Sequence, residues 1–335
     1  MRFDFTVAVL SDTQNYSEKY PDVFHGQTKW LAENARRERI VFATHVGDIV
    51  QNGGQTPGEW DVATAAMARL YGKVPCGVVA GNHDYDVLSD KTCPLNVYRR
   101  NFGAAYHKKV QTLLELSPDE CSAIHMFEAA GQRMLSLHLE PDPRDGALAW
   151  AEAMLAKYPD IPVMVTTHIY ISDVDDARDR KPYSRAGGNS GEDLFQKFIR
   201  KQPRIFLVLC GHWWTRGGET SLMSTNDFGG RVHELLSDFQ GRANGGDGWL
   251  RLLRFDLKGH QLHVQTYSPT LKRYETDLDS EFTLPLDLHR AIPAEPARLQ
   301  KAWRRPSPQW RPGGIADLRM LASPPAADAL SNFLG

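Results

Sequence analysis

The chain is 335 residues long, with 41% hydrophobic and 24% charged residues and a formal net charge of −2. A chain of this length and hydrophobic content can bury a substantial core, which excludes wholesale disorder. The balance of 39 basic against 41 acidic residues gives no support to nucleic acid as a partner or to a polybasic membrane binder.

No apolar run is long enough to cross a membrane, since the longest runs span about five to nine residues where about 20 are needed. We therefore expect no membrane partner. The chain opens on a strand-like pattern over residues 1–10 rather than on a signal peptide, which favours a cytoplasmic location. The four cysteines, at positions 76, 93, 121 and 210, are too scattered to indicate a disulfide framework or a CxxC zinc site.

Short apolar runs alternate with amphipathic stretches over the first two thirds of the chain. The predicted strands span residues 5–10, 40–44, 74–80, 134–139, 163–167 and 205–210, and the predicted helices span residues 28–38, 59–71, 147–157 and 192–201. Strands and helices in alternation predict an α/β fold with much of its sheet parallel.

The pattern changes after Gly211. Three further strands are predicted at residues 231–239, 249–256 and 261–267, and only short turns join them. This arrangement indicates a second, more antiparallel sheet.

Three segments interrupt or extend this organisation. Residues 85–132 are less regular and are interpreted as an insertion that carries a helix or two. Residues 172–191 form a polar loop, and a loop of that length inside a compact domain is typically functional. Residues 286–335 are rich in proline and are interpreted as a C-terminal extension of a domain that spans residues 1–285.

Metal-binding residue types follow five of the predicted strands. Because the carboxyl ends of parallel strands line the ligand crevice of an open α/β sheet, we expect these side chains to meet at one edge. The motifs are Ser11-Asp12-Thr13-Gln14, Gly47-Asp48, Gly81-Asn82-His83-Asp84, His168 and Gly211-His212.

This ordered set resembles the calcineurin-like metallophosphoesterase superfamily, whose signature runs Asp-x-His, Gly-Asp, Gly-Asn-His-Asp/Glu, a single His, and Gly-His-x-His. The match extends from Asp12 to His212. Residues 233–240 and 245–251 resemble a bacterial subgroup that also begins Ser-Asp-Thr-Gln. The resemblance implies a four-layer α/β/β/α sandwich of two mixed sheets.

The resemblance also implies two metals bridged by Asp48. Asn82, His168 and His212 would complete one metal site, and Asp12 would belong to the other. Mixed oxygen and nitrogen ligands suit Mn, Fe or Zn, so we expect one or two such ions per chain.

The implied activity is hydrolysis of a small-molecule phosphoester, in which a metal-bound hydroxide held at Asp48 attacks phosphorus. His83 would assist the leaving group, with Asp84 orienting His83. Two cations close together lower the pKa of bound water and hold the attacking and leaving oxygens in line, which suits phosphoryl chemistry.

Two positions depart from the family pattern. Gln14 stands where Asp-x-His has its histidine, and Trp214 replaces the second histidine of Gly-His-x-His. Tryptophan cannot bind a metal, because its indole nitrogen is only a donor. Gln14 is interpreted either as a weak ligand through its amide oxygen or as a hydrogen-bond partner of a ligand, and Trp214 as an apolar wall of the substrate pocket.

The polar loop carries basic residues that can bind a substrate phosphate, foremost Arg178 and Arg185 beside Arg180 and Lys181. The alternative is a solvated mixture of charges, since four aspartates precede or separate them.

Two other functions stay open at this point because of Gln14 and Trp214. The chain can be a catalytically weak metal-binding or regulatory protein, or an enzyme repurposed for non-phosphate chemistry at a single-metal site. Robust metal-dependent hydrolysis of a phosphoester would exclude the first, and a bound organic ligand without phosphate would favour the second.

Overall fold

The computed structural model describes residues 3–88, 90, 92, 94–172, 179–181, 187–214, 217–289 and 303–304. Residues 1–304 cluster as one compact unit. The predicted C-terminal extension lies mostly outside the described residues, so its boundary stays a prediction.

The first sheet, sheet A, has seven strands in the order β15-β14-β13-β1-β2-β3, with β16 paired to β14. β1, β2 and β3 are parallel, whereas β13 to β16 pair antiparallel, so the sheet is mixed. The strands are β1 Phe5–Leu10, β2 Ile40–His45, β3 Cys76–Val78, β13 Leu250–Asp256, β14 Gln261–Ser268, β15 Arg273–Glu275 and β16 Glu281–Pro285.

The second sheet, sheet B, has eight strands in the order β17-β11-β12-β10-β7-β6-β5-β4. β6, β7, β10 and β12 run parallel, and the outer strands pair antiparallel. The strands are β4 Leu113–Leu116, β5 Ala123–Ala129, β6 Gln132–His138, β7 Val163–Thr166, β10 Ile205–Cys210, β11 Glu219–Thr225, β12 Arg231–Ser237 and β17 Trp303–Arg304. A separate short pair joins β8 Ile171–Ser172 to β9 Asp179–Arg180.

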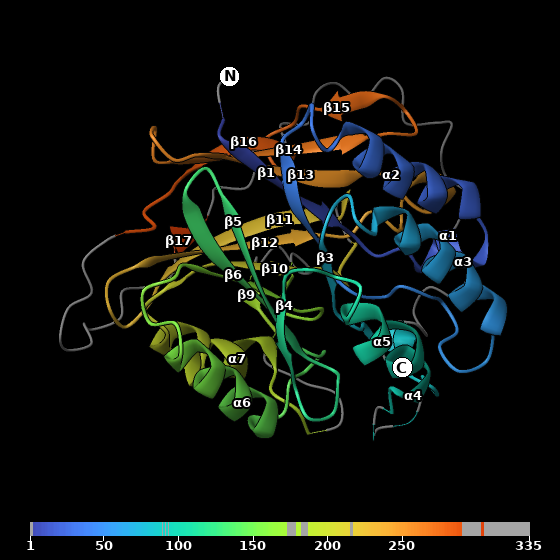
Figure 1. Ribbon diagram of the computed structural model, residues 1–335, viewed down its shortest axis with the longest axis horizontal. Helices are drawn as coiled ribbons and strands as arrows, with labels where there is room; N and C mark the ends of the chain where they lie inside the picture. Colours follow the sequence, from blue (N-terminus) through green and yellow to red (C-terminus); the bar gives the residue numbers. More distant parts are fainter. Residues whose placement is uncertain are drawn as a thin grey trace, which may run out of the picture. The chain divides into compact units, whose positions relative to one another are not determined.

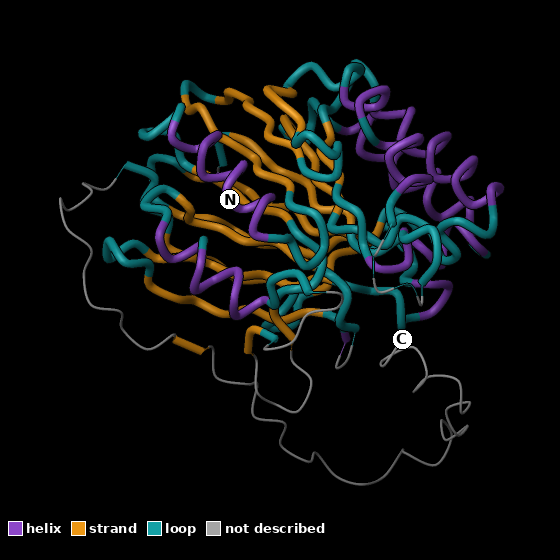
Figure 2. The backbone as a smooth tube through the Cα atoms, turned by 90° about the horizontal axis from the view of Figure 1, so that it is seen from below, coloured by secondary structure: helices purple, strands orange, loops and turns teal. Residues whose placement is uncertain are grey.

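Helices cover the outer faces of the two sheets, which confirms the predicted four-layer sandwich (Figures 1 and 2). α1 to α3 lie beside sheet A, and α6 and α7 lie beside sheet B, with the strands of both sheets between them. The helices are α1 Gln14–Glu18, α2 Pro21–Asn34, α3 Pro57–Met67, α4 Asn96–Phe102, α5 Ala104–His107, α6 Asp145–Ala156 and α7 Gly191–Lys197. The predicted insertion thus supplies α4, α5, the edge strand β4 and its neighbour β5.

β1 shows why a strand in this fold is apolar throughout. Its odd positions, such as Val7 and Val9, pack between the two sheets, whereas Ala8 and Leu10 pack toward the helices. Alternate side chains of a strand face opposite sides, so a strand covered on both faces reads as a continuous apolar run.

The largest difference between a predicted and an observed helix boundary lies at the start of α2. α2 begins at Pro21, seven residues before the predicted start at residue 28. Proline fits the first turn of a helix, since its fixed φ is already helical and its missing N–H has no partner there.

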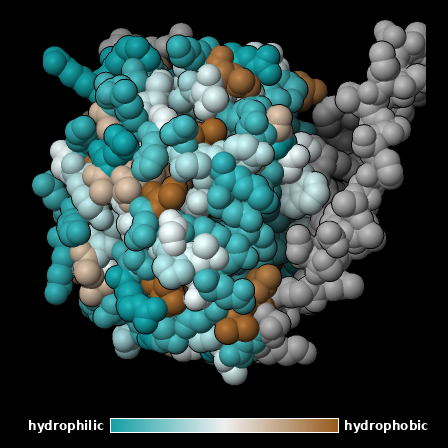
Figure 3. Space-filling model, turned by 90° about the vertical axis from the view of Figure 1, so that its right-hand side faces the viewer, coloured by the Kyte–Doolittle hydropathy of each residue, from teal (hydrophilic) through white to brown (hydrophobic). Residues whose placement is uncertain are grey.

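The face of the molecule shown in Figure 3 is mostly hydrophilic, with hydrophobic residues in isolated positions. Such scattered residues are normal on the surface of a folded protein. Within the described ranges, no helix combines the length and apolar character that a membrane crossing requires.

Candidate metal centre

Polar residues follow six parallel strands at one end of the two sheets. β1, β2 and β3 are neighbours in sheet A, and β7, β10 and β12 are neighbours in sheet B. The carboxyl ends of parallel strands meet at one edge, which brings distant parts of the chain together. The residues after these ends include Asp12, Asp48, Asn82, His168, His212 and Asp238.

Glycines let the loops at these strand ends approach the carboxylates. Gly47 and Asp48 have φ values of 102° and 50°, in the left-handed region that non-glycine residues adopt only at a cost. A β-carbon added at Gly81 would lie 2.1 Å from Asp48 Oδ1, and one at Gly211 would lie 2.1 Å from Asp12 Oδ1. The glycines of the sequence motifs therefore serve close packing around the two acids.

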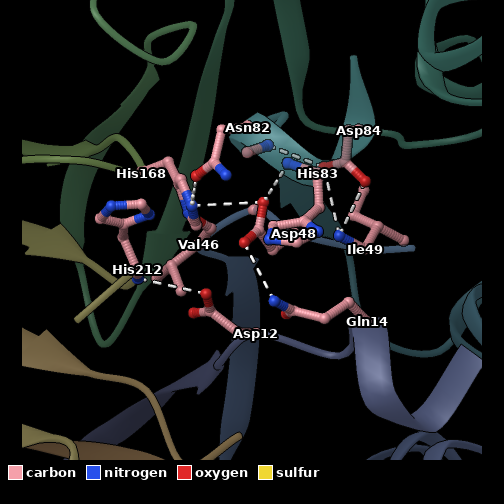
Figure 4. Close-up of polar contacts among 12 residues, drawn as sticks. Asp12, Gln14, Val46, Asp48, Ile49, Asn82, His83, Asp84, His168 and His212 are labelled. Atoms are coloured by element: carbon pink, nitrogen blue, oxygen red, sulfur yellow. Dashed lines mark hydrogen bonds and ion pairs between the residues drawn. The ribbon is translucent and has the colours of Figure 1, made fainter. Parts of the chain in front are cut away.

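Four of the predicted ligands come together around Asp48 (Figure 4). Asp48, His168 and His212 each offer one ligand atom, and these atoms lie within 4.8 Å of one another. His168 Nε2 is 3.3 Å from Asp48 Oδ1 and 3.2 Å from Asn82 Oδ1. His168 Nδ1 donates to the main-chain oxygen of Val46 at 2.8 Å. That bond leaves Nε2 as the metal-binding atom.

Asp12 and Gln14 lie on the other side of Asp48. Asp12 Oδ2 accepts the main-chain N–H of His212 at 3.1 Å. Gln14 Nε2 donates to Asp48 Oδ2 at 3.1 Å and to Gln240 Oε1 at 2.7 Å. Among the described residues, Asp12 Oδ1 and Gln14 Oε1 are buried without a hydrogen-bond partner. Buried polar atoms are normally paired, so these two oxygens fit a bound cation.

The carboxyl groups of the centre differ in the direction of their pKa shifts. Burial raises the pKa of Asp48, but the neighbouring imidazoles, led by that of His168, outweigh burial and hold the pKa below its usual range. Burial raises the pKa of Asp12 well above its usual value, and the charges of Asp238 and then Asp48 raise it further. A divalent cation would lower the pKa of each of these carboxyl groups, because it stabilises the ionised form of every carboxyl group around it.

His83 and Asp84 do not form the predicted pair. His83 Nδ1 donates to the main-chain oxygen of Gln51 at 2.9 Å. The Asp84 carboxylate accepts main-chain N–H groups at 2.7–3.1 Å, from Ile49, Val50 and Gly81. Burial raises the pKa of Asp84 to about 7. Asp84 thus holds two ligand-bearing loops together, because the unpaired N–H groups of tight turns compete for a nearby carboxylate.

Gln240 contacts Gln14 and Asp238, and the sequence analysis singled out neither Gln240 nor Asp238. The predicted strand 231–239 is two residues too long, since β12 ends at Ser237 and Asp238 leaves the sheet. Asp238 is buried, and its carboxylate accepts the main-chain and side-chain N–H groups of Gln240 at 2.9 and 2.8 Å. The available signal was the subgroup resemblance of residues 233–240, which carried no role for either residue.

Trp213 and Trp214 take different positions beside His212. The ring of Trp213 is buried, with its centroid 4.6 Å from that of His212, and Lys181 Nζ lies 4.9 Å from its centroid. Trp214 is 37% exposed and covers Gly241, where an added β-carbon would lie 2.3 Å from the indole ring. Contact between Trp214 and substrate stays a prediction.

Arg180 is neither a phosphate ligand nor a solvated charge. It is buried, and its guanidinium donates twice to the Glu234 carboxylate at 2.7 Å. It also contacts Ser224 and stacks 3.4 Å from the ring centroid of Phe195. This pairing anchors β9 to β12 of sheet B. Arg178 and Arg185 lie outside the described residues.

Replacing Arg180 by methionine is expected to destabilise the protein by about 3–5 kcal/mol, because Glu234 then keeps its buried negative charge without the cation that compensates it. Urea unfolding measures the loss. The double variant Arg180→Met/Glu234→Leu should recover most of it, since no charge then stays buried. A single variant within about 1 kcal/mol of wild type would contradict this account.

Comparison with known proteins agrees with this geometry. The model of the calcineurin-like phosphoesterase family matches residues 5–215. The chain is 31% identical over 298 residues to an uncharacterized protein, YvnB, from Bacillus subtilis (strain 168); the match covers 86% of this chain and 22% of that protein's length. The structure of a purple acid phosphatase, PPD1, from yellow lupin (Lupinus luteus) superposes with a TM-score of 0.51 at 16% identity, over 86% of this chain and 55% of the lupin chain. The chain therefore belongs to the calcineurin-like phosphoesterase family.

Proposed function

We propose that the chain is a metal-dependent hydrolase of small-molecule phosphoesters. The observation that supports this best is the convergence of Asp48, His168 and His212, with one ligand atom each within 4.8 Å of the others. Asn82 contacts the same His168 nitrogen at 3.2 Å. Mixed nitrogen and oxygen donors suit Mn, Fe or Zn.

In such a reaction, each residue of the candidate centre would have a separate role. Bound cations supply acidity to coordinated water and positive charge for the phosphoryl oxygens. Asp48 and His168 would bind a cation through Oδ1 and Nε2, which lie 3.3 Å apart. The Val46 carbonyl fixes the orientation of the His168 ring. His83 donates its main-chain N–H to Asp48 Oδ1 at 2.8 Å, and Figure 4 shows the side chain of His83 next to Asp48.

His83 is the proposed proton donor to the leaving oxygen. Its Nδ1 faces a carbonyl oxygen, which only accepts, so Nδ1 carries a hydrogen and Nε2 is the nitrogen available for proton exchange. A positioned acid of this kind contributes about 10²–10⁴-fold to turnover.

His83→Ala is expected to lower kcat by about 10²–10⁴-fold while the metal content stays at the wild-type value. Turnover of phenyl phosphate should fall more than that of p-nitrophenyl phosphate, since the nitrophenolate leaves with less need of a proton. Assays with both esters, together with elemental analysis of the dialysed variant, test the assignment. Equal turnover of wild type and variant on both esters would refute it.

Gln14 and Trp214 replace two imidazole ligands of the family pattern. These replacements favour a second candidate function, a metal-binding or repurposed protein. A chain with only the site around His168 and His212 can bind metal and hydrolyse little. Metal-loaded protein that turns over neither phosphomonoesters nor phosphodiesters, such as bis(p-nitrophenyl) phosphate, would favour this metal-binding or repurposed function.

A further inference from the structure

A second group of metal-binding side chains lies beside the hairpin of β4 and β5, apart from the centre around Asp48. Asp119, Cys121 and Glu140 each offer one ligand atom, a carboxylate oxygen or the thiol sulfur, and these atoms lie within 4.8 Å of one another. Asp119 and Cys121 are in the turn between β4 and β5, and Glu140 follows the end of β6. β4, β5 and β6 are neighbours in sheet B (Figure 1), so the fold brings the three side chains together.

Hydrogen bonds hold this turn in place and fasten it to the loop after β6. The Ser117 main-chain N–H donates to the Ser122 carbonyl at 2.8 Å, and the Ser122 N–H donates to Ser117 Oγ at 2.9 Å. The Ser117 hydroxyl donates to Asp119 Oδ1 at 2.6 Å. The Glu140 main-chain N–H donates to Ser122 Oγ at 3.1 Å. The positions that carry the three ligand atoms are therefore set by the fold itself, which is the preorganisation that a metal site needs.

Two of the three groups are buried with little to compensate a charge. Cys121 is 8% and Glu140 6% exposed, whereas Asp119 is open to solvent. One Glu140 carboxylate oxygen accepts the Arg144 main-chain N–H at 3.3 Å, and the other has no hydrogen bond or ion pair in the described ranges. Burial raises the pKa of the Cys121 thiol, and the charges of Asp119 and Glu140 raise it further.

Nearby arginines do not pair with these acids. Arg99 and Arg144 lower the pKa of Cys121, but among the described residues their guanidinium groups donate to main-chain oxygens, at 3.5 and 3.1 Å, rather than to the Asp119 or Glu140 carboxylate. A buried carboxylate beside a buried thiol is costly unless a cation compensates the charge. A bound metal ion would stabilise the ionised form of both groups at once.

We propose that Asp119, Cys121 and Glu140 form a Zn²⁺ site that ties the turn between β4 and β5 to the end of β6. One thiolate and two carboxylates are donors that zinc accepts, and water completes the set on the exposed side of Asp119. With metal–ligand bonds of about 2.0–2.3 Å, tetrahedral ligand atoms lie about 3.5–4 Å apart, so small side-chain rotations close the site. The sulfur ligand disfavours Mg²⁺ and Ca²⁺, which take oxygen. Because one position opens to solvent, the ion exchanges with the medium and is not expected to survive dialysis.

The test adds Co²⁺, a spectroscopic substitute for Zn²⁺, to full-length protein that is stripped of metal and kept reduced. A thiolate ligand gives a sulfur-to-cobalt charge-transfer band in the near ultraviolet, which the nitrogen and oxygen ligands around Asp48 cannot give. Wild type should show this band, and added Zn²⁺ should abolish it. Cys121→Ser should lose the band, and Glu140→Gln should need at least about 10-fold more Co²⁺ to reach it. Glu128→Gln removes an exposed carboxylate from β5 and should match wild type.

The outcomes separate this inference from the proposed function. Absence of the band from wild type overturns the inference, as does its persistence in Cys121→Ser or an unchanged Co²⁺ affinity in Glu140→Gln. Visible absorption from Co²⁺ at the centre shows that a variant is folded; loss of both signals in both variants also overturns the inference, because the two residues would then support the fold. A band in wild type without any Co²⁺ at the centre supports the inference and refutes the proposed function alone.

Discussion

Replacing Asp48 by asparagine is expected to remove bound metal and hydrolytic activity together. Asp48 Oδ1 lies 3.3 Å from His168 Nε2, and Oδ2 accepts from Gln14 Nε2 at 3.1 Å, so both halves of the centre share this carboxylate. The amide keeps the size of the side chain but removes the charge that binds cations. Loss of several kcal/mol of transition-state stabilisation corresponds to a fall of at least about 10³-fold in kcat/KM.

Elemental analysis after dialysis and an assay on p-nitrophenyl phosphate measure the two losses in parallel. Asp61→Asn, on the exposed face of α3, controls for the removal of any acidic group. Wild-type metal content in Asp48→Asn would remove Asp48 from the ligand set. Activity that survives without metal would refute the proposed function.

The second large effect concerns three buried histidines that pack against one another, one on α5 and two on the neighbouring strands β5 and β6 of sheet B. His107, His125 and His138 are buried, and the His125 ring centroid lies 5.2 Å from each of the other two. Phe42 of sheet A contacts His125 and His138, at centroid distances of 5.7 and 6.1 Å. Burial lowers the pKa of His107 to about 4, that of His138 to about 3, and that of His125 well below its usual value.

These histidines make the folded state sensitive to acid. Their pKa values are depressed in the folded protein, whereas the unfolded chain binds protons near the ordinary value of about 6.5. Protonation of the unfolded chain therefore favours unfolding as the pH falls below about 6.5. Each histidine contributes a loss of about 1.4 kcal/mol per pH unit down to about pH 4, and the three together about 4 kcal/mol per unit.

Urea unfolding of wild type and His125→Phe between pH 7 and pH 4.5 isolates one histidine. Phenylalanine keeps the ring in place and does not titrate, so the stability of the variant relative to wild type should rise by about 1.4 kcal/mol per pH unit below about 6.5. Buried acids such as Asp84, whose raised pKa of about 7 acts in the opposite direction, are the same in both proteins and cancel.

His260→Asn, at an exposed histidine, provides the matched control, and asparagine tolerates the positive φ of 53° at this position. Its stability should follow wild type at every pH. Parallel curves for wild type and His125→Phe would show that the buried imidazole does not contribute to acid sensitivity.

The apolar runs predicted most of the central strands because burial on two sides leaves a continuous hydrophobic signal. β1 and β10 begin and end as predicted, at Phe5–Leu10 and Ile205–Cys210. Edge strands such as β4, with exposed positions in Leu113–Leu116, carry no such signal and were missed. The helix α4 was expected only as part of an irregular insertion, because seven residues are too few for a clear period.

The order of motifs along the chain also predicted which ligands meet, since topology alone brings the ends of parallel strands to one edge. Asp48, His168 and His212 needed no further information. Arg180 was misjudged because a charge run in a polar loop reads as solvated, and only the folded chain brings Glu234 to it from β12.

By itself, the sequence determined the alternation of strands and helices and, through the motifs that directly follow strands, the resemblance to the family; that resemblance in turn implied the four-layer fold and the residues of one candidate metal site. Only the tertiary structure decided the hydrogen-bond partners of the other polar residues at the centre. In the fold, Asp84 accepts from main-chain N–H groups and His83 donates to a main-chain oxygen instead. Gln14 contacts Gln240, more than two hundred positions later in the chain, and Gln240 in turn donates to Asp238. Such contacts depend on where a strand ends and where buried polar groups find partners, and both are settled by packing across the two sheets rather than by any local pattern.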